Sequence, residues 1–209
     1  MVGQGVLREC LLDPEVGRVL TVGRNATGQQ HPKLRELVVP NLFDYSAVES
    51  DLAGYDACIF TLGVSAAGMT EEAYSHMTYD LTLAAATTLA RLNPGLTFVY
   101  VSGQGTDSSE QGRMMWARVK GRTENALLRL FQRAFLFRPG FIQPLHGIRS
   151  KTKAYQMFYT LLGPILPLLR RLFPRHITTT EQLGRAMLKA AKGGTEKRVL
   201  EMPDITGMA

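Results

Sequence analysis

The sequence is poor in cysteine and tryptophan and has no long uninterrupted apolar run. Cys10 and Cys58 are its only cysteines, and one lies in a helical pattern while the other lies in an apolar strand pattern. A disulfide framework or a zinc site is therefore not expected, and both should be reduced thiols of the core. The first residues show no charged start followed by an apolar stretch and a small-residue cleavage site, which argues against secretion and by default predicts a cytoplasmic location.

Low-complexity tracts and internal repeats are also absent. The 209 residues are 45% hydrophobic and 20% charged, with a mean hydropathy of -0.04, which is typical of a folded globular protein. A chain of this length can bury one sizeable core but is short for two. We expect a single domain over residues 1–209, with residues 141–180 as its substrate-side or lid region.

The net charge of +6 and the sequence pI near 9.5 are compatible with nucleic acid, an anionic membrane surface or a phosphorylated ligand as partner. No aromatic RNA-binding signature or helix-turn-helix pattern is present, so we predict no nucleic-acid partner. A solvated basic face is the main interpretation, and phosphate attraction is the alternative. The clustered cations are Arg149, Lys151, Lys153, Arg170, Arg171 and Arg175.

Short apolar strands alternate with helical patterns along the chain. This order predicts an α/β fold with a doubly wound, mostly parallel sheet that is covered on both faces. Strands are expected at residues 18–23, 34–40, 56–62, 98–102, 134–138 and 198–202. Helices are expected at 4–12, 45–52, 70–91 and 180–191, in a stretch that carries Trp116 and runs to about Arg133, and, after a loop, in the apolar region of 141–173.

The stretch from Phe98 to Lys120 is the predicted centre of the molecule. A buried strand ends at Ser102, and the following helix carries Trp116 and Lys120 four residues apart, on one face. Ligands of parallel sheets bind beyond the carboxyl ends of the strands. The residues at those ends should line one rim: Gly23-Arg24, Gly63, Ser102-Gly103 and Pro139-Gly140.

The start of the chain departs from the usual order of a nucleotide-binding sheet. Such a sheet opens with a strand and a glycine-rich turn, and the helix that follows points its N-terminus at the phosphates. Residues 1–5, Met-Val-Gly-Gln-Gly, look like the tail of that turn, with no strand ahead of them. We interpret the chain as N-terminally truncated relative to the complete fold.

Seven segments, in this order, resemble a known family: MVGQGVL, VLTVGR, the turn Asn41 to Asp44, FTLG, VYVSGQGTDSS, WARVKGRTEN and FRPGFIQP. The family is that of the atypical short-chain dehydrogenase/reductases of the NAD(P)-dependent epimerase/dehydratase type, within it the Tat-interacting-protein-like oxidoreductases. No single segment is decisive, but their order and spacing together are fairly specific. The resemblance implies a Rossmann-like NAD(P)-binding fold.

The resemblance also implies a cofactor site. Arg24, after the second family strand, stands where an arginine accommodates the phosphate of NADP, so NADP is the expected cofactor and NAD remains possible. A solvent-exposed loop arginine is the alternative. The matching cofactor positions are Gly3, Gly23, Arg24, Asn41, Leu42, Thr61, Leu62, Gly63, Ser102, Lys120, Pro139, Gly140 and Phe141. Because the phosphate-binding turn is incomplete, we expect these 209 residues to bind the cofactor weakly or not at all.

The catalytic positions match the family only in part. Ser102 and Lys120 match its serine and lysine, which polarise the substrate carbonyl and bind the nicotinamide ribose, but Trp116 stands in place of its tyrosine. An indole N–H is a donor only, so Trp116 cannot serve as general acid and base. His146 lies where substrate-specificity residues would be, although a lone loop histidine is more often in solvent or packing.

Two functions therefore remain open. The first is an NADP-preferring oxidoreductase or epimerase-like protein that acts on a small molecule, with hydride chemistry impaired by Trp116. The second is a non-catalytic NADP-binding sensor or protein-interaction module of the same fold. The apolar segment Tyr155 to Phe173, interrupted by Pro164 and Pro167, is too short to span a bilayer. It predicts a lid or a homodimer interface, and peripheral membrane contact is the minor alternative.

Overall fold

The computed structural model describes residues 1–148 and 177–208. All its strand pairs are parallel, in three ladders. The central ladder has the order β3 (Ala57–Phe60), β4 (Thr97–Val101), β5 (Ala134–Arg138) and β8 (Val199–Glu201). A second joins β1 (Val19–Gly23) to β2 (Leu34–Val38), and a third joins β6 (Phe141–Gln143) to β7 (Ile177–Thr179). The parallel α/β prediction is confirmed, but β1 and β2 stand apart from the central ladder.

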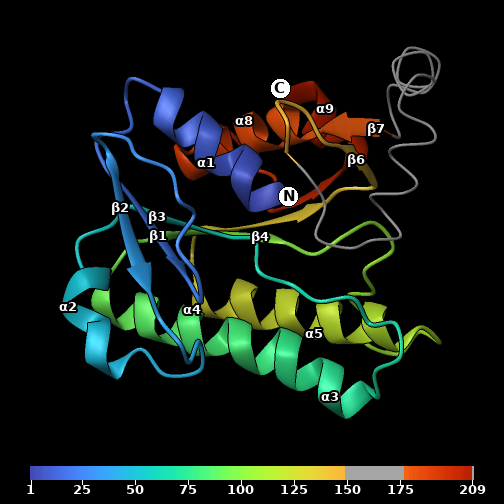
Figure 1. Ribbon diagram of the computed structural model, residues 1–209. Helices are drawn as coiled ribbons and strands as arrows, with labels where there is room; N and C mark the ends of the chain where they lie inside the picture. Colours follow the sequence, from blue (N-terminus) through green and yellow to red (C-terminus); the bar gives the residue numbers. More distant parts are fainter. Residues whose placement is uncertain (149–176, 209) are drawn as a thin grey trace.

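Helices cover both sides of the strands (Figure 1), as the doubly wound prediction requires. On one side lie α1 (Val2–Leu12), α8 (Thr180–Ala191) and α9 (Met202–Met208). On the other lie α2 (Glu49–Leu52), α3 (Glu71–Ser75), α4 (Leu81–Leu92) and α5 (Met115–Leu130).

Strand β4 divides the core into two layers. Phe98 and Tyr100 belong to the apolar cluster on the α4 side, whereas Val99 belongs to the cluster that contains residues of α1 and α8. Side chains alternate across a strand, so a strand buried on both faces must be apolar at every position. The segment TFVYV meets that condition, and Phe98 and Val99 are fully buried. β4 is thus the rigid element that carries Ser102 at its end.

Several boundaries differ from the sequence predictions. The helix expected at residues 70–91 contains a π-helical turn, η2 (His76–Asp80), between α3 and α4. The one expected at 45–52 begins as a 3₁₀ turn, η1 (Ser46–Val48). In the region assigned to a loop and an apolar helix, residues 141–143 form β6. Neither β7 nor α9 was predicted, because three-residue strands and a Pro- and Gly-containing helix carry little periodicity.

Helix α1 packs closely against α8 through two glycines. A Cβ on Gly5 would lie 2.6 Å from the carbonyl oxygen of Thr180, and one on Gly184 would lie 3.0 Å from the carbonyl oxygen of Gly5. Only glycine permits so close an approach without a shift of backbone. The contact fixes the first turn of α1 beside the sheet, where a Cβ on Gly3 would lie 2.7 Å from Thr61 Oγ1.

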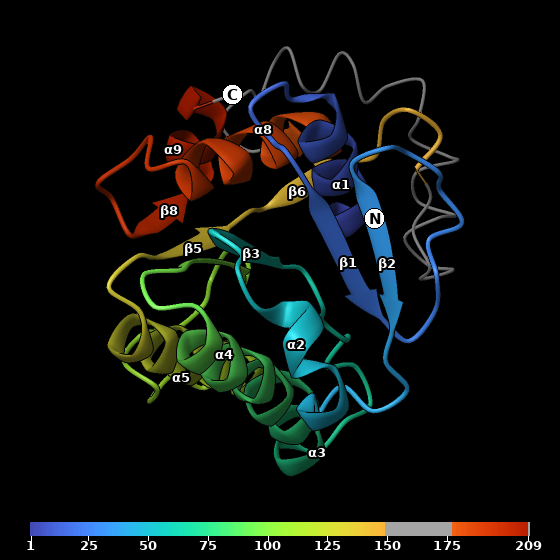
Figure 2. The same ribbon diagram turned by 90° about the vertical axis from the view of Figure 1, so that its left-hand side faces the viewer.

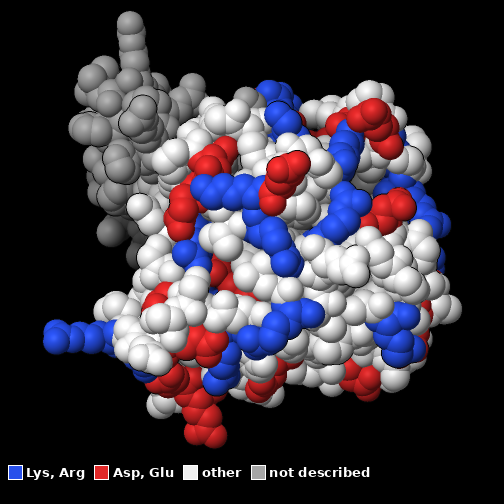
Figure 3. Space-filling model, turned by 180° about the vertical axis from the view of Figure 1, so that it is seen from behind, with Lys and Arg blue, Asp and Glu red and all other residues white. Residues whose placement is uncertain are grey.

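Both cysteines are free, as predicted, and burial raises the pKa of Cys10 to about 11 and that of Cys58 to about 12. Within the described ranges, no helix is both long and apolar enough to cross a bilayer. The apolar segment Tyr155 to Phe173 and the cluster of cations between residues 149 and 175 lie outside the described residues. On the face drawn in Figure 3, basic and acidic side chains are intermixed and no single sign dominates.

Candidate functional site

The loops that follow β4 and β5 are joined at the carboxyl ends of their strands. The amide of Ser102 donates to the carbonyl of Phe137 at 2.9 Å, and the amide of Gln104 donates to the carbonyl of Pro139 at 2.9 Å. Ser102 is buried, with 5% of its surface exposed. The predicted rim residues Ser102 and Pro139 therefore belong to one hydrogen-bonded platform, which Gly140 and Phe141, the first residue of β6, continue along the chain.

Lys120 reaches this platform from α5. Its Nζ donates to the backbone carbonyl of Ser102. Burial lowers the pKa of Lys120 to about 8, although the charge of Glu124 acts in the opposite direction. A lysine ammonium that is removed from water loses hydration, which disfavours its charged form. The structure thus brings Ser102 and Lys120 together, as the sequence pattern predicted, with a lysine close to its titration point near neutral pH.

The hydroxyl of Ser102 is already engaged within the protein. It lies 2.5 Å from Glu124 Oε1 and 3.2 Å from the carbonyl oxygen of Phe137, both of which are acceptors. A serine hydroxyl has a single proton to donate. In this arrangement Ser102 can accept a hydrogen bond from a ligand, but polarising a substrate carbonyl would require its bond to Glu124 to break.

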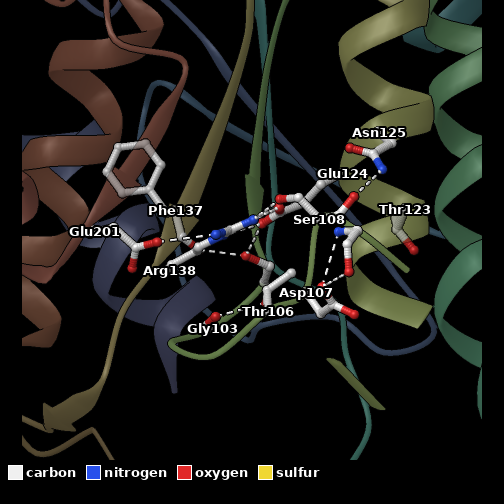
Figure 4. A network of polar contacts seen from close by, with 12 residues as sticks. Gly103, Thr106, Asp107, Ser108, Thr123, Glu124, Asn125, Phe137, Arg138 and Glu201 are labelled. Atoms are coloured by element: carbon white, nitrogen blue, oxygen red, sulfur yellow. Dashed lines mark hydrogen bonds and ion pairs between the residues drawn. The ribbon is translucent and has the colours of Figure 1, made fainter. Parts of the chain in front are cut away.

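Glu124 and Arg138 form a buried charge network beneath the platform (Figure 4), and sequence reasoning missed it. Arg138 Nε lies 3.1 Å from Glu124 Oε1, and its terminal nitrogens contact Glu124 Oε2, Glu201 Oε1 and Ser108 Oγ. Glu124 is 1% exposed. The available signal was a carboxylate four residues after Lys120, on the helix face that also carries Trp116.

Trp116 lies against the loop after β4. A Cβ on Gly105, whose φ is +86°, would lie 3.4 Å from the indole ring. The tyrosines near this region give no evident replacement for a proton donor. Tyr100 and Tyr74 are each 2% exposed, and burial raises the pKa of both. Tyr79 lies on η2 with the guanidinium of Arg122 4.3 Å above its ring.

The remaining predicted cofactor residues lie in three other places. Gly3 and Thr61 meet where α1 begins. Leu62 is 39% exposed, and a Cβ added to the neighbouring Gly63 would have no atom within 4 Å. Gly23 ends β1 and Arg24 is exposed. Asn41 Oδ1 accepts from the amide of Phe43 at 3.1 Å, and Leu42 is buried in the core. No described hydrogen bond joins these groups to the Ser102 platform, so their common role stays a prediction.

His146 follows β6 and pairs with a residue of α8. Its Nε2 lies 2.6 Å from Glu181 Oε2, and its φ is +55°, an uncommon value for a residue other than glycine. Within the described residues, no group of three or more His, Cys, Asp or Glu side chains is placed to hold a metal ion.

No family model and no curated protein matches the sequence. Solved structures do match over nearly the whole chain. The ADP-L-glycero-D-manno-heptose-6-epimerase of Helicobacter pylori matches with a TM-score of 0.66 at 13% identity, over 96% of this chain and 72% of that one. The chain has the Rossmann-like fold of these proteins. The enzyme WbmH of Bordetella bronchiseptica, solved in complex with NAD+, matches with a TM-score of 0.65 at 16% identity, over 92% and 69% of the two chains.

The chain is also similar in structure to a short chain dehydrogenase family protein from Francisella tularensis. It matches with a TM-score of 0.61 at 12% identity, over 97% of this chain and 93% of that one. The Rossmann-like fold is therefore shared with epimerases and with a short chain dehydrogenase, in agreement with the expectation from the sequence motifs.

Proposed function

We propose that the protein binds NADP(H), with NAD(H) as the weaker ligand, and acts as an oxidoreductase or epimerase-like protein on a small molecule at the carboxyl end of β4. The observation that carries the proposal is the position of Lys120, whose Nζ bonds the carbonyl of Ser102 and whose pKa is lowered to about 8. A partly buried ammonium at this place can donate to the hydroxyls of a nicotinamide ribose.

The residues at the nicotinamide end fit such a ligand. Bound NADP(H) would supply or accept a hydride there. Lys120 would hold the ribose, and the loop after β4, with Gly103 at φ +138° and Gly105 at φ +86°, lets backbone approach a ligand closely. At the other end, the first turn of α1 presents amides that favour a phosphate.

Binding can be measured by calorimetric titration of NADPH and NADH into the wild type and into Lys120→Met. Losing a hydrogen bond from a charged group should weaken NADPH binding by about tenfold or more. Lys189→Met is the matched control, since Lys189 is exposed on α8, and it should bind as the wild type does. Equal affinities for the wild type and Lys120→Met would refute the assigned site.

The NADP preference is proposed to rest on Arg24, which is exposed after β1. Arg24→Ala should weaken NADPH binding by about tenfold and leave NADH binding nearly unchanged, because only NADPH carries the additional phosphate. Arg35→Ala removes an arginine from the neighbouring strand and is the control. An equal loss for both cofactors would show that Arg24 does not read the phosphate.

The non-catalytic NADP-binding module is the second candidate, and the hydroxyl of Ser102 supports it. That hydroxyl donates within the protein to Glu124 or Phe137, and Trp116 cannot exchange a proton near neutral pH. Turnover separates the candidates: Trp116→Tyr should create or greatly raise carbonyl reduction if the fold retains binding without catalysis. Turnover by the wild type that Trp116→Tyr does not change would show that another group donates the proton.

A further inference from the structure

The chain makes a tight turn soon after it leaves β6. The amide of Ile148 donates to the carbonyl of Leu145 at 3.1 Å, and the two residues between them, His146 and Gly147, have φ values of +55° and +73°. A turn with positive φ at both central positions suits glycine, asparagine and aspartate. Histidine is less usual there, so the conformation of His146 persists only because contacts from elsewhere hold it.

Two contacts hold the turn on the start of α8. The amide of Leu145 donates to Thr180 Oγ1 at 3.1 Å, and His146 Nε2 lies 2.6 Å from Glu181 Oε2. Thr180 and Glu181 are the first two residues of that helix. Consecutive residues of the turn therefore contact consecutive residues of α8. Only the second contact joins two side chains that can change charge with pH.

The carboxylate of Glu181 belongs to a chain of charges that extends to α1, which lies beside α8 (Figure 2). Its Oε1 lies 2.7 Å from a terminal nitrogen of Arg185, whose Nε lies 3.0 Å from Glu9 Oε2. The hydrogen bond with His146 lowers the pKa of Glu181. The charges of Arg185 and Arg8 add to that effect, although burial opposes it. Glu181 is therefore a carboxylate at neutral pH.

Two histidines border the surface hollow beside α1, His146 from the turn and His31 from the loop before β2. His31 Nδ1 accepts from the amide of Lys33 at 3.2 Å, which ties this ring to its own loop. Histidine is the side chain that ordinarily changes charge between about pH 5 and 8, whereas arginine and glutamate do not. The imidazole of His146 thus sets whether its contact with Glu181 is an ion pair.

The contact is open to water on one side. The side chain of His146 is 40% exposed and that of Glu181 is 22% exposed, so solvent screens the two charges in part. Ion pairs of this kind change an equilibrium by about fivefold at most. Because the positive φ of His146 already weakens the docked turn, a change of this size is enough to shift its population.

We propose that His146 and Glu181 form a pH-sensitive latch, which docks the turn of residues 145–148 on α8 when the imidazole is protonated and loosens it when the imidazole is neutral. A charged imidazole attracts the carboxylate more strongly than a neutral one, so linkage favours docking as the pH falls. Since β6 continues the platform of Ser102 and Pro139 along the chain, the latch sets how firmly the chain beyond that platform is tethered. The proposal is independent of the cofactor assignment.

The amide of Leu145 reports the latch, because it donates to Thr180 in the docked turn. Its hydrogen exchange, measured by NMR at about pH 5.5 and about pH 8 and corrected for the intrinsic exchange rate, compares the docked populations. Protection in the wild type should be about threefold to fivefold greater at the lower pH. The amide of Ala73, which donates to Thr70 Oγ1 at the start of α3, is the reference and should be equally protected at both. Protection of Leu145 that is equal at both pH values, or greater at the higher one, would overturn the proposal.

Two histidine variants test which imidazole is responsible. His146→Gln retains a hydrogen-bond donor but gains no charge, so protection of Leu145 should become independent of pH and equal that of the wild type at the higher pH. His76→Gln is the matched control, since it removes a histidine that pairs with Asp80 at 3.0 Å on η2, and it should leave the pH dependence unchanged. A pH dependence that survives in His146→Gln would contradict the latch.

A double-variant cycle tests the partner. Glu181→Gln should abolish the pH dependence as His146→Gln does, and the two changes together should cause no further loss. Additive losses would show that the two side chains act separately. Loss of the pH dependence in His31→Gln would assign the titration to His31, and this result also would overturn the proposal. Circular dichroism equal to that of the wild type shows that each variant keeps its fold.

Discussion

Strands β4 and β1 have similarly apolar sequences but very different surroundings. β4 has a strand on each side, and four of its five residues are buried. β1 has a partner on one side only, and each of its five residues is partly exposed. Apolar sequence thus sets the potential for burial, while the number of neighbouring strands decides how much of it is realised. The platform with Lys120 lies at the end of the strand that is paired on both sides, whereas β1 keeps one side without a strand in the described part of the chain.

Of the changes considered, breaking the charge network of Arg138 and Glu124 should lower the free energy of unfolding most. Arg138→Met would leave Glu124 buried without its charged partner, which should lower the free energy of unfolding by about 3–5 kcal/mol. Urea unfolding measures the loss. In the double variant Arg138→Met with Glu124→Gln, the unpaired charge is gone and part of the stability should return. A single variant as stable as the wild type would contradict a buried, energetically coupled pair.

The same change, leucine to alanine, should lower the free energy of unfolding several times more in the central ladder than on β1. Leu136 on β5 is fully buried, and Leu136→Ala should cost about 3 kcal/mol or more of unfolding free energy. Leu20 is partly exposed on β1, a strand with a partner on one side only, so Leu20→Ala should cost about 1 kcal/mol of unfolding free energy. Urea unfolding of both variants under one condition gives the comparison, and equal losses would show that Leu20 is as well packed in solution as Leu136.

A pH series tests the environment of Lys120. Its pKa is about 8 in the folded protein, below its ordinary 10.5, so between these values the unfolded chain binds more protons than the folded one. Stability of the wild type relative to Lys120→Met should therefore rise with pH across this window, by about 3 kcal/mol at most. The same stability at both ends of the window, after subtraction of the variant, would contradict a desolvated ammonium.

Much of the fold was predictable because the strands that carry it are long enough to show their burial. VLTVG, TFVYV and AFLFR are apolar at nearly every position, and each forms a strand close to its predicted bounds. The separation of β1 from β3 is consistent with the missing opening strand that the first residues indicated, although the composition of β1 alone does not show how many strands pair with it. The three-residue strands β6 and β7 were missed because they show no period.

The site was predictable in part for a comparable reason. The proximity of Ser102 and Lys120 was expected from spacing, since a strand end and a helix face fix where each side chain lies, whereas their role in a site stays a prediction. The pairing of Glu124 with Arg138 was missed, because a lone carboxylate in a helix usually lies in solvent and only the tertiary fold shows that this one is buried.

The most direct test of the proposed cofactor site uses Trp116, the single tryptophan of the chain, as its own reporter. Trp116 lies on the same helix as Lys120, one turn before it, with its ring against Gly105, so a nicotinamide bound at the proposed site would lie close to the indole. We predict that NADPH, titrated into the millimolar range because weak binding is expected, quenches Trp116 emission in a saturable way, and that Lys120→Met shifts the titration to about tenfold higher concentrations. Emission that NADPH does not change, beyond its own absorbance, would contradict the account.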